Sequence, residues 1–307
     1  MKVAVLIPCY NEEQAVAGVV RDFRAALPEA ALYVYDNNSA DGTVEQARSA
    51  GAVVRHERLQ GKGNVVRRMF ADVEADIYVM VDGDATYHAG SAPMMIRKLV
   101  DDNLDMVVGT RLQSGEAGAF RQGHHLGNRL LTGFVAWLFG DRFGDMLSGY
   151  RVLSRRFVKS FPALAQGFET ETELAVHALA LHMPVAEVET PYFARPDGSE
   201  SKLRTWRDGW RILLMVVKLL KDERPLFFFT AAFAVLAAIA VALAAPIVLT
   251  YRETGLVPRF PTAILSTGIM ILAFLSLASG VILDTVKHGR RELKRLHYLR
   301  FKAPGAE

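Results

Sequence analysis

Short apolar runs alternate with amphipathic segments through the first half of the chain. Five such runs are predicted to be strands: Val3–Ile7, Leu32–Tyr35, Ala52–Val54, Ile77–Val81 and Met106–Val108. Between them, apolar residues recur at helical spacing in Glu12–Leu27 and Gly63–Val73. This alternation predicts an α/β domain with a mostly parallel sheet covered by helices on both faces. Ligands of such sheets bind beyond the carboxyl ends of the strands.

The pattern is less regular further along the chain. Further helices are predicted at Leu126–Phe139 and Glu171–Leu181, and further strands at Tyr150–Leu153 and Val185–Val188. Pro191–Lys202 has no periodicity and is predicted to be a loop. Arg204–Lys221 mixes tryptophans and aliphatic residues with basic ones, which favours a helix in the membrane interface over a core helix of the soluble domain.

Two long apolar segments follow, Pro225–Leu249 and Thr262–Leu283. Each exceeds the about 20 residues that a helix needs to cross a bilayer, which favours membrane helices over buried helices of a soluble protein. The outer flanks, Lys218–Arg224 and Lys287–Arg300, are strongly basic, whereas the connection between the two segments is not. The positive-inside rule therefore predicts a multi-pass hairpin anchor in the cytoplasmic (inner) membrane, with both termini cytoplasmic.

These patterns divide the chain into six parts. We expect a cytosolic catalytic domain at 1–203, an amphipathic interfacial helix at 204–224, transmembrane helices at 225–249 and 262–283, a short non-cytoplasmic loop at 250–261, and a basic cytoplasmic tail at 284–307. The apolar share of 51% is concentrated after Pro225, so the first part has the composition of a soluble protein.

The net charge of +3, without basic and aromatic residues interleaved, argues against nucleic acid as a partner. The single cysteine, Cys9, is predicted to be buried in a strand.

Polar residues of catalytic type follow the predicted strands. Asp82 and Asp84 lie one residue apart after a buried run, so they face the same direction and could share Mg²⁺ or Mn²⁺ on a diphosphate. The alternative is an ordinary acidic surface turn. Lys62 begins a predicted helix and can approach phosphate. Asp36 can accept hydrogen bonds from a nucleotide base, and Glu12 can reach a base or ribose hydroxyls.

The membrane anchor implies a lipid acceptor. A lipid monophosphate has a second pKa of about 6, so it is largely dianionic at neutral pH and needs no strong base. Asp145 is the carboxylate expected nearest the acceptor, with capping of the Ser148–Tyr150 turn as the alternative. Among the arginines, Arg129 and Arg151 are preferred over Arg111 and Arg121 as phosphate ligands. For Glu169 and Glu171, helix capping is favoured over contact with sugar hydroxyls.

Seven motifs in this order resemble the family 2 glycosyltransferases of the GT-A fold. They are IPCYNEE (Ile7–Glu13), YDNNSADGT (Tyr35–Thr43), GKGNVVR (Gly61–Arg67), DGDATY (Asp82–Tyr87), DMLSGYRVLSRR (Asp145–Arg156), FETETEL (Phe168–Leu174) and RPDGSESKL (Arg195–Leu203). The resemblance is strongest to enzymes that charge polyprenyl phosphates, such as dolichol-phosphate mannose synthases. It implies a Rossmann-like, mostly parallel sheet of the nucleotide-diphospho-sugar transferase type, followed here by two transmembrane helices.

The resemblance also implies roles for particular residues. Nucleotide binding would fall to Pro8, Tyr10, Glu12 and Asp36, the metal and diphosphate to Asp82 and Asp84, and the lipid phosphate to Arg195, Ser201 and Lys202. Two positions depart from the family pattern. Asn37 and Asn38 stand where many relatives have a second acidic residue, and Thr86 stands where mannose synthases often have a glutamine metal ligand. The base and the sugar therefore stay open.

The function expected from the sequence is an inverting, metal-dependent hexosyltransferase. It would move one sugar from a UDP- or GDP-sugar to polyprenyl phosphate for cell-envelope glycan or glycoconjugate assembly, with Asp84 and Asp145 central to catalysis. The alternatives are a non-catalytic nucleotide-sugar-binding membrane scaffold, a transferase with a protein or another lipid as acceptor, and a polysaccharide synthase. The sequence lacks the Gln/Arg-x-x-Arg-Trp motif of processive synthases. A homo-oligomer is left open.

Overall fold

The fold was analysed in a computed structural model that describes residues 1–113, 133–134, 137, 144–164, 169–195, 214 and 216–305. The chain divides into two compact units. Unit 1 comprises Met1–Ile212 together with Leu293–Glu307, and unit 2 comprises Leu213–Glu292. The catalytic-type motifs all belong to unit 1, and the two long apolar segments belong to unit 2.

Unit 1 is built on one mixed sheet. Its described strands are β1 (Val3–Cys9), β2 (Ala31–Asp36), β3 (Val53–His56), β4 (Ile77–Met80), β5 (Met106–Gln113), β6 (Arg151–Ser154) and β7 (Val185–Tyr192). They are ordered β3-β2-β1-β4-β6-β5-β7. Among these strands, β6 alone runs antiparallel to its neighbours. The predicted mostly parallel sheet is therefore confirmed.

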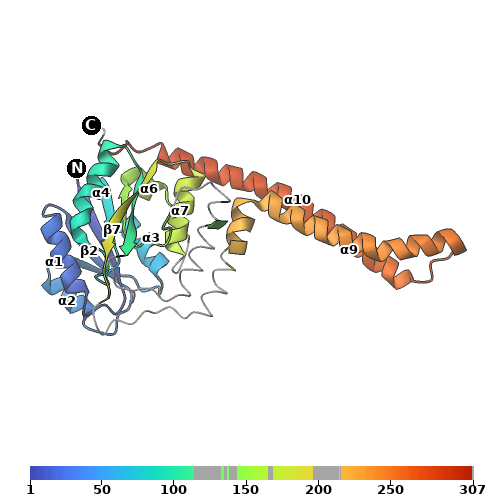
Figure 1. Cartoon of the computed structure of the whole chain (residues 1–307), viewed down its shortest axis with the longest axis horizontal. Helices are drawn as coiled ribbons and strands as arrows, with labels where there is room; N and C mark the ends of the chain where they lie inside the picture. The colour runs from blue at the N-terminus through green and yellow to red at the C-terminus, as the bar shows by residue number, and fades with distance from the viewer. Residues whose placement is uncertain are drawn as a thin grey trace. The chain divides into compact units, whose positions relative to one another are not determined.

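Helices cover both faces of this sheet (Figure 1). Their bounds are α1 (Val16–Ala26), α2 (Thr43–Ser49), α3 (Lys62–Asp72), η1 (Ala89–Ser91), α4 (Ala92–Asp101), α6 (Arg155–Ser160) and α7 (Thr170–Ala180). Helices α1, α2 and α4 lie on one face, and α3, α6 and α7 lie on the other. Helix α1, for example, buries Val16, Val20 and Phe23 of its apolar stripe in the core beside the sheet. The result is a three-layer α/β/α arrangement.

The first helix starts later than its apolar pattern predicts. Residues 12–15 form a turn in which the Glu12 carbonyl accepts hydrogen bonds from the N–H groups of Ala15 and Val16, at 3.0 and 2.9 Å. The Glu12 N–H in turn donates to Thr43 Oγ1 at 2.8 Å. This contact ties the end of β1 to the start of α2, so the backbone at Glu12 belongs to the strand-end loops rather than to a helix.

Other predicted elements differ in extent or lie outside the described residues. The strand predicted at Val185–Val188 continues as β7 to Tyr192, because its partner β5 also runs on to Gln113. The helix predicted at Leu126–Phe139 lies largely outside the described residues, within which Gly133, Phe134 and Trp137 are helical. Most of the predicted interfacial helix is outside them too, although residues 216–223 are helical.

Unit 2 is a helical hairpin of α9 (Pro225–Thr254) and α10 (Phe260–Tyr298), whose last residues belong to unit 1. The helices pack through Phe233 and Phe274, whose ring centroids are 5.4 Å apart, and Ser276 Oγ donates to the Phe229 carbonyl at 3.2 Å. In the most apolar 18-residue stretch of each helix, only 6% of the residues in α9 and 11% of those in α10 are buried. Core helices of a soluble protein would be mostly buried, so α9 and α10 are candidate membrane spans.

The predicted basic tail is not a separate segment, since Leu293–Glu307 groups with unit 1. Tyr298 Oη donates to Oδ2 of Asp105 at 2.8 Å, and Asp105 is fully buried. Arg156 pairs with the same carboxylate and lies 4.8 Å from the Tyr298 ring centroid. A buried carboxylate needs such partners, so the chain's last described residues complete the packing of unit 1.

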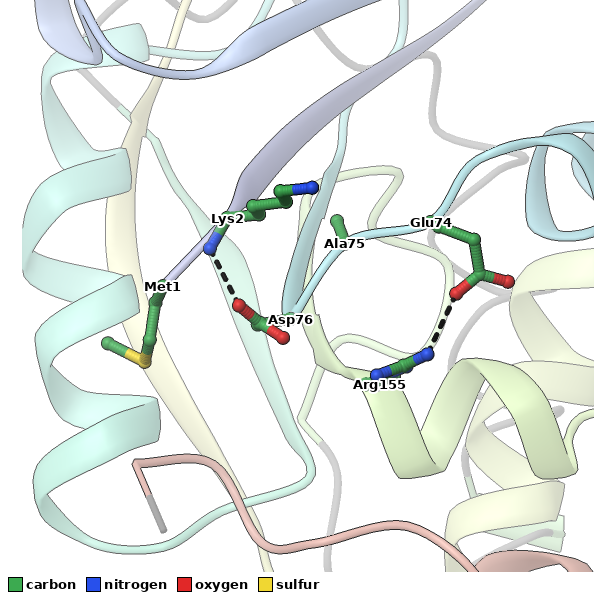
Figure 2. A pocket seen from close by; sticks show the side chains of 6 residues that line it. All are labelled: Met1, Lys2, Glu74, Ala75, Asp76 and Arg155. Carbon is green, nitrogen blue, oxygen red and sulfur yellow. Dashed lines mark hydrogen bonds and ion pairs between the residues drawn. The ribbon is translucent and has the colours of Figure 1, made fainter. Parts of the chain in front are cut away.

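Figure 2 shows an open hollow of about 430 Å³ in unit 1. It lies where β1 and β4 begin, between Lys2, Asp76, Glu74 and Arg155. The Lys2 N–H donates to Asp76 at 2.7 Å, and Arg155 pairs with Glu74 at 3.1 Å. The hollow is therefore at the opposite end of these strands from the edge that parallel α/β sheets use for ligands, and it contains none of the predicted site residues.

Candidate active site

The carboxyl ends of three adjacent strands bring the predicted donor-binding residues to one edge of the sheet. Strand β1 lies between β2 and β4, and Cys9 at its end is in register with Asp36. Beyond β1 lies Tyr10, which is 37% exposed, and beyond β4 lie Asp82 and Asp84. Pro8 is within β1, opposite Tyr35. The sheet topology thus gathers the residues that the sequence placed at separate strand ends.

Asp36 has local partners at this edge. Its carboxylate is buried and accepts from the Ser39 N–H at 3.3 Å, and His56 Nδ1 lies 3.2 Å away. Cys9, at the end of the neighbouring strand, is also buried, as predicted. Burial, followed by nearby carboxylates, raises the pKa of the Cys9 thiol well above its ordinary value. Cys9 is therefore a packing residue rather than a nucleophile.

Lys62 links two carboxylates from different parts of the chain. It is the first residue of α3, and its Nζ lies 2.5 Å from Asp82 Oδ1 and also pairs with Glu171 of α7. The Glu171 side chain is 6% exposed. Burial alone would lower the pKa of the Lys62 ammonium, but the two carboxylates outweigh it and raise that pKa. The N-cap residue Glu169 makes no side-chain cap hydrogen bond, and the Glu171 carboxylate binds Lys62, so the favoured prediction of helix capping by these two residues is not observed.

Asn37 fixes the loop that precedes Lys62. Its Oδ1 accepts from the Gly61 N–H at 2.7 Å, and its Nδ2 donates to the carbonyls of Glu57 and Leu59 at 2.9 and 2.8 Å. A carboxylate at this position would have no N–H to offer the two carbonyls. The departure from the family pattern at Asn37 therefore has a structural reason: the amide positions the start of α3.

Asp84 is buried, and its carboxylate is oriented by Thr86, the second position at which the sequence departs from the family pattern. Thr86 Oγ1 donates to Asp84 Oδ1 at 2.6 Å, and the Thr86 N–H lies 3.3 Å from the same oxygen. Between them Ala85 has φ +60°, a left-handed conformation that costs an L-residue roughly 1–2 kcal/mol. This turn brings Thr86 back to Asp84. Its hydroxyl serves here to hold the carboxylate.

The segment after β7 runs beside this turn. The Phe193 N–H donates to the Thr86 carbonyl at 2.9 Å, and the rings of Tyr87 and Tyr192 lie 5.3 Å apart. Two residues beyond Phe193, Arg195 Nη2 reaches Oδ2 of Asp84 at 2.7 Å. Arg195, predicted to bind an acceptor phosphate, is therefore placed at the candidate metal carboxylate.

Asp145 forms a two-pronged ion pair. Arg111 of β5 donates through Nε and Nη2 to its two oxygens, each at 2.7 Å. The N–H groups of Gly144 and Asp145 donate to Glu187 at 2.8 and 3.1 Å, which fixes the backbone there. The alternative role as a turn cap is wrong, because Ser148 Oγ accepts from the Tyr150 N–H. Sequence alone gave no reason to prefer Arg111, whose importance depends on β5 and the segment before β6 meeting in space.

Arg151 is a correction to the predicted phosphate ligands. Its side chain is fully buried, with Nε 3.1 Å from the Ser148 carbonyl and Nη2 2.5 Å from the Met146 carbonyl. Burial also lowers the pKa of the guanidinium. Arg151 therefore supports the turn behind Asp145 and is not available to a phosphate. The other predicted ligands Arg129, Ser201 and Lys202 lie outside the described residues.

The donor set at Asp82 and Asp84 fits a hard divalent cation. Within the described ranges, no group of three or more His, Cys, Asp or Glu side chains converges on one point. Mg²⁺ is commonly held by one or two carboxylates together with substrate phosphates and water, so two carboxylates are sufficient. Both already attract positive groups, since Lys62 and Arg195 lie against them. Asp82 and Asp84 would hold the ion.

Gly149 lies directly against Asp82, which makes it a test of the carboxylate's position. A Cβ atom at Gly149 would lie 2.6 Å from Asp82 Cγ and closer still to Oδ2. We therefore expect Gly149→Ala to displace Asp82 and to lower kcat by about tenfold to a hundredfold, measured as initial transfer rates. Gly18→Ala in α1 is the matched control, because a Cβ there meets nothing within 4 Å. Equal rates for the two variants would contradict a catalytic role for the position of Asp82.

Comparison with known proteins gives a consistent family match. The model of "Glycosyl transferase family 2" matches residues 4–159. Glycosyltransferase AglJ of Haloferax volcanii is 37% identical over 228 residues, which cover 74% of this chain and 75% of the relative. Protein RfbJ of Shigella flexneri is 57% identical over 122 residues, or 40% and 95% of the two chains. A dolichyl-phosphate hexose transferase of Haloferax volcanii is 29% identical over 221 residues, or 72% and 95%.

Solved structures show the same fold. Glucosyl-3-phosphoglycerate synthase from Mycobacterium tuberculosis, in complex with phosphoglyceric acid, superposes with a TM-score of 0.59 at 23% identity, covering 72% of this chain and 79% of that one. The same enzyme has been crystallised with Mn²⁺, UDP-glucose and phosphoglyceric acid, and that structure gives a TM-score of 0.58 at 23% identity with the same coverage. At this identity the likeness establishes the GT-A-like fold, as predicted.

Proposed function

This chain belongs to glycosyl transferase family 2, and we propose that it transfers a single hexose from a UDP- or GDP-sugar to a polyprenyl phosphate with inversion at the anomeric carbon. The observation that carries the proposal is the union of a family 2 domain with two apolar helices in one chain. A water-soluble donor can then meet an acceptor dissolved in lipid. The name of the dolichyl-phosphate hexose transferase relative supports the same class of acceptor.

On the donor side, the strand-end residues would bind the nucleotide. Asp36, Tyr10 and Glu12 lie at the edge where the base and ribose would be held. Asp82 and Asp84 would hold Mg²⁺ or Mn²⁺, which when bound offsets the charge of the departing diphosphate. Lys62 stays protonated because its pKa is raised, and its ammonium could turn from Asp82 toward a phosphate.

On the acceptor side, little acid-base chemistry is needed. A phosphate oxygen of the dianionic lipid attacks the anomeric carbon, a new carbon–oxygen bond forms, and the bond to the nucleoside diphosphate breaks. Positioning and charge stabilisation then carry most of the rate. Arg111 is held by Asp145 at the same end of the sheet and could bind a phosphate there. Asp145 would act as the group that positions this guanidinium.

The proposed location follows from the anchor. Helices α9 and α10 would span the cytoplasmic membrane as a hairpin, with unit 1 on the cytoplasmic side. The basic residues that flank both apolar segments support this orientation.

The proposal is tested by transfer to a defined lipid. The purified full chain is incubated with Mn²⁺, a panel of radiolabelled UDP- and GDP-hexoses, and undecaprenyl or dolichyl phosphate in detergent. We expect label in the organic phase that depends on the lipid and on the divalent cation. Label that appears only on a soluble phosphorylated acceptor such as 3-phosphoglycerate, or on no acceptor, would contradict the proposal.

A further inference from the structure

Each of the three candidate acidic residues is paired with a basic side chain of the same chain. Lys62 lies against Asp82 at 2.5 Å, Arg195 against Asp84 at 2.7 Å, and Arg111 against Asp145 at 2.7 Å. The site therefore neutralises its own carboxylates. A divalent cation entering it meets carboxylates that already hold a positive charge.

The pair at Asp84 differs from the other two. Arg195 is 35% exposed, whereas Lys62 and Arg111 are 12% and 16% exposed. The guanidinium at Asp84 is thus the most exposed of the three basic groups to an ion or substrate entering from solvent.

Arg195 and a metal ion would compete for the same oxygen of Asp84. Its Oδ1 accepts from the Thr86 hydroxyl, and its Oδ2 is the atom that Arg195 contacts. A divalent ion bound at Oδ2 would take the position of the guanidinium nitrogen, and the two positive charges would repel each other. One cation would therefore leave as the other binds.

We propose that a divalent cation and Arg195 exchange at Asp84, and that the displaced guanidinium then binds a phosphate of the bound substrates. The inference rests on the proposed function, because it takes Asp84 as a metal ligand. Without the ion, Arg195 keeps the buried carboxylate paired. With the ion bound, the freed guanidinium offers a planar pair of donors that suits phosphate. Loading of the ion thereby prepares the site for its anionic substrates.

The exchange predicts that removing the competitor strengthens metal binding. In Arg195→Gln, Mn²⁺ should bind about three- to tenfold more tightly than in the native protein, because a partly exposed ion pair no longer has to be broken. Free Mn²⁺ is measured by electron paramagnetic resonance with the full chain in detergent, without donor or lipid. Arg68→Gln is the charge-matched control, since Arg68 pairs with Asp72 on an exposed part of α3. Equal affinities in the two variants would overturn the exchange.

A second measurement uses the native protein. Phenylglyoxal modifies accessible guanidinium groups, and mass spectrometry reports the rate at each arginine. Mn²⁺ should accelerate modification of Arg195 over the same concentration range in which it binds, while the rate at Arg68 stays constant. An Arg195 rate that saturating Mn²⁺ leaves unchanged would show that the guanidinium is not released.

Two further measurements identify which substrate phosphate the Arg195 guanidinium binds. With Mn²⁺ present, a roughly tenfold weaker UDP or GDP affinity in Arg195→Gln assigns the guanidinium to the nucleoside diphosphate. A raised KM for polyprenyl phosphate with unchanged nucleotide affinity assigns it to the acceptor. If neither changes, the phosphate step is wrong. The Mn²⁺ and phenylglyoxal results do not require sugar transfer, so they remain decisive even if the proposed transferase reaction is not found.

Discussion

Replacing Asp84 with asparagine should lower kcat for sugar transfer by about a hundredfold to a thousandfold. The amide keeps the shape of the side chain and can still accept the hydrogen bond from Thr86 Oγ1. It lacks the negative charge that would hold a divalent cation beside the leaving diphosphate. Initial rates over a Mn²⁺ titration measure the effect, and added Mn²⁺ should restore little of the loss.

The control for this substitution is Asp102→Asn. Asp102 follows α4 and pairs with Lys98 at 2.9 Å on the protein surface, so the same charge is lost outside the site. Thr86→Val removes only the hydroxyl that orients Asp84, and its rate should fall between those of the two asparagine variants. If Asp84→Asn retained the rate of Asp102→Asn, Asp84 would not be a metal ligand in the reaction.

Replacing Lys62 with methionine should destabilise unit 1 strongly. Asp82 and the buried Glu171 would then face each other without their shared cation. Breaking a buried ion pair by removing one partner costs about 3–5 kcal/mol, which corresponds to a fall in Tm of roughly 6–20 °C for a domain of this size. Thermal unfolding of the full chain in detergent, followed by intrinsic fluorescence, measures it.

Two variants separate this electrostatic effect from lost packing. Lys98→Met removes a lysine from an exposed i,i+4 pair and should change stability by less than about 0.5 kcal/mol. Lys62→Met combined with Glu171→Gln should recover most of the lost Tm, because one of the two facing charges is gone, yet transfer should stay low. A Tm for Lys62→Met no lower than that of Lys98→Met would disprove the buried network.

The local sequence pattern was sufficient to identify the site residues at the strand ends, but not the residues that pair with them. The period of an extended segment, together with the rule that ligands bind at strand ends, was enough to direct attention to Asp82 and Asp84. Glu171 could not be connected to Lys62 in this way, because the contact depends on α7 packing against α3. The pairing of Arg195 with Asp84 likewise depends on the chain after β7 returning to the turn after β4.

Arg151 shows a different limit of sequence reasoning. A charged residue in a Gly- and Ser-containing segment suggests a surface ligand, since arginine is rarely buried without partners. Here the turn before β6 presents the carbonyls of Met146 and Ser148 to the interior, and the guanidinium supplies their donors. Only the turn geometry, which charge and spacing do not encode, distinguishes this structural arginine from a phosphate ligand.

The bond from Tyr298 to Asp105 has a consequence for biosynthesis. Residues Leu293–Glu307 complete unit 1, but they are translated after the whole of α9 and most of α10. Until they leave the ribosome, the Asp105 carboxylate lacks the Tyr298 hydroxyl and keeps Arg156 and Ser154 as side-chain partners. Unit 1 therefore reaches its final packing only after the hairpin of α9 and α10 has been synthesised. Folding of the enzymatic unit cannot be completed before the apolar helices are made.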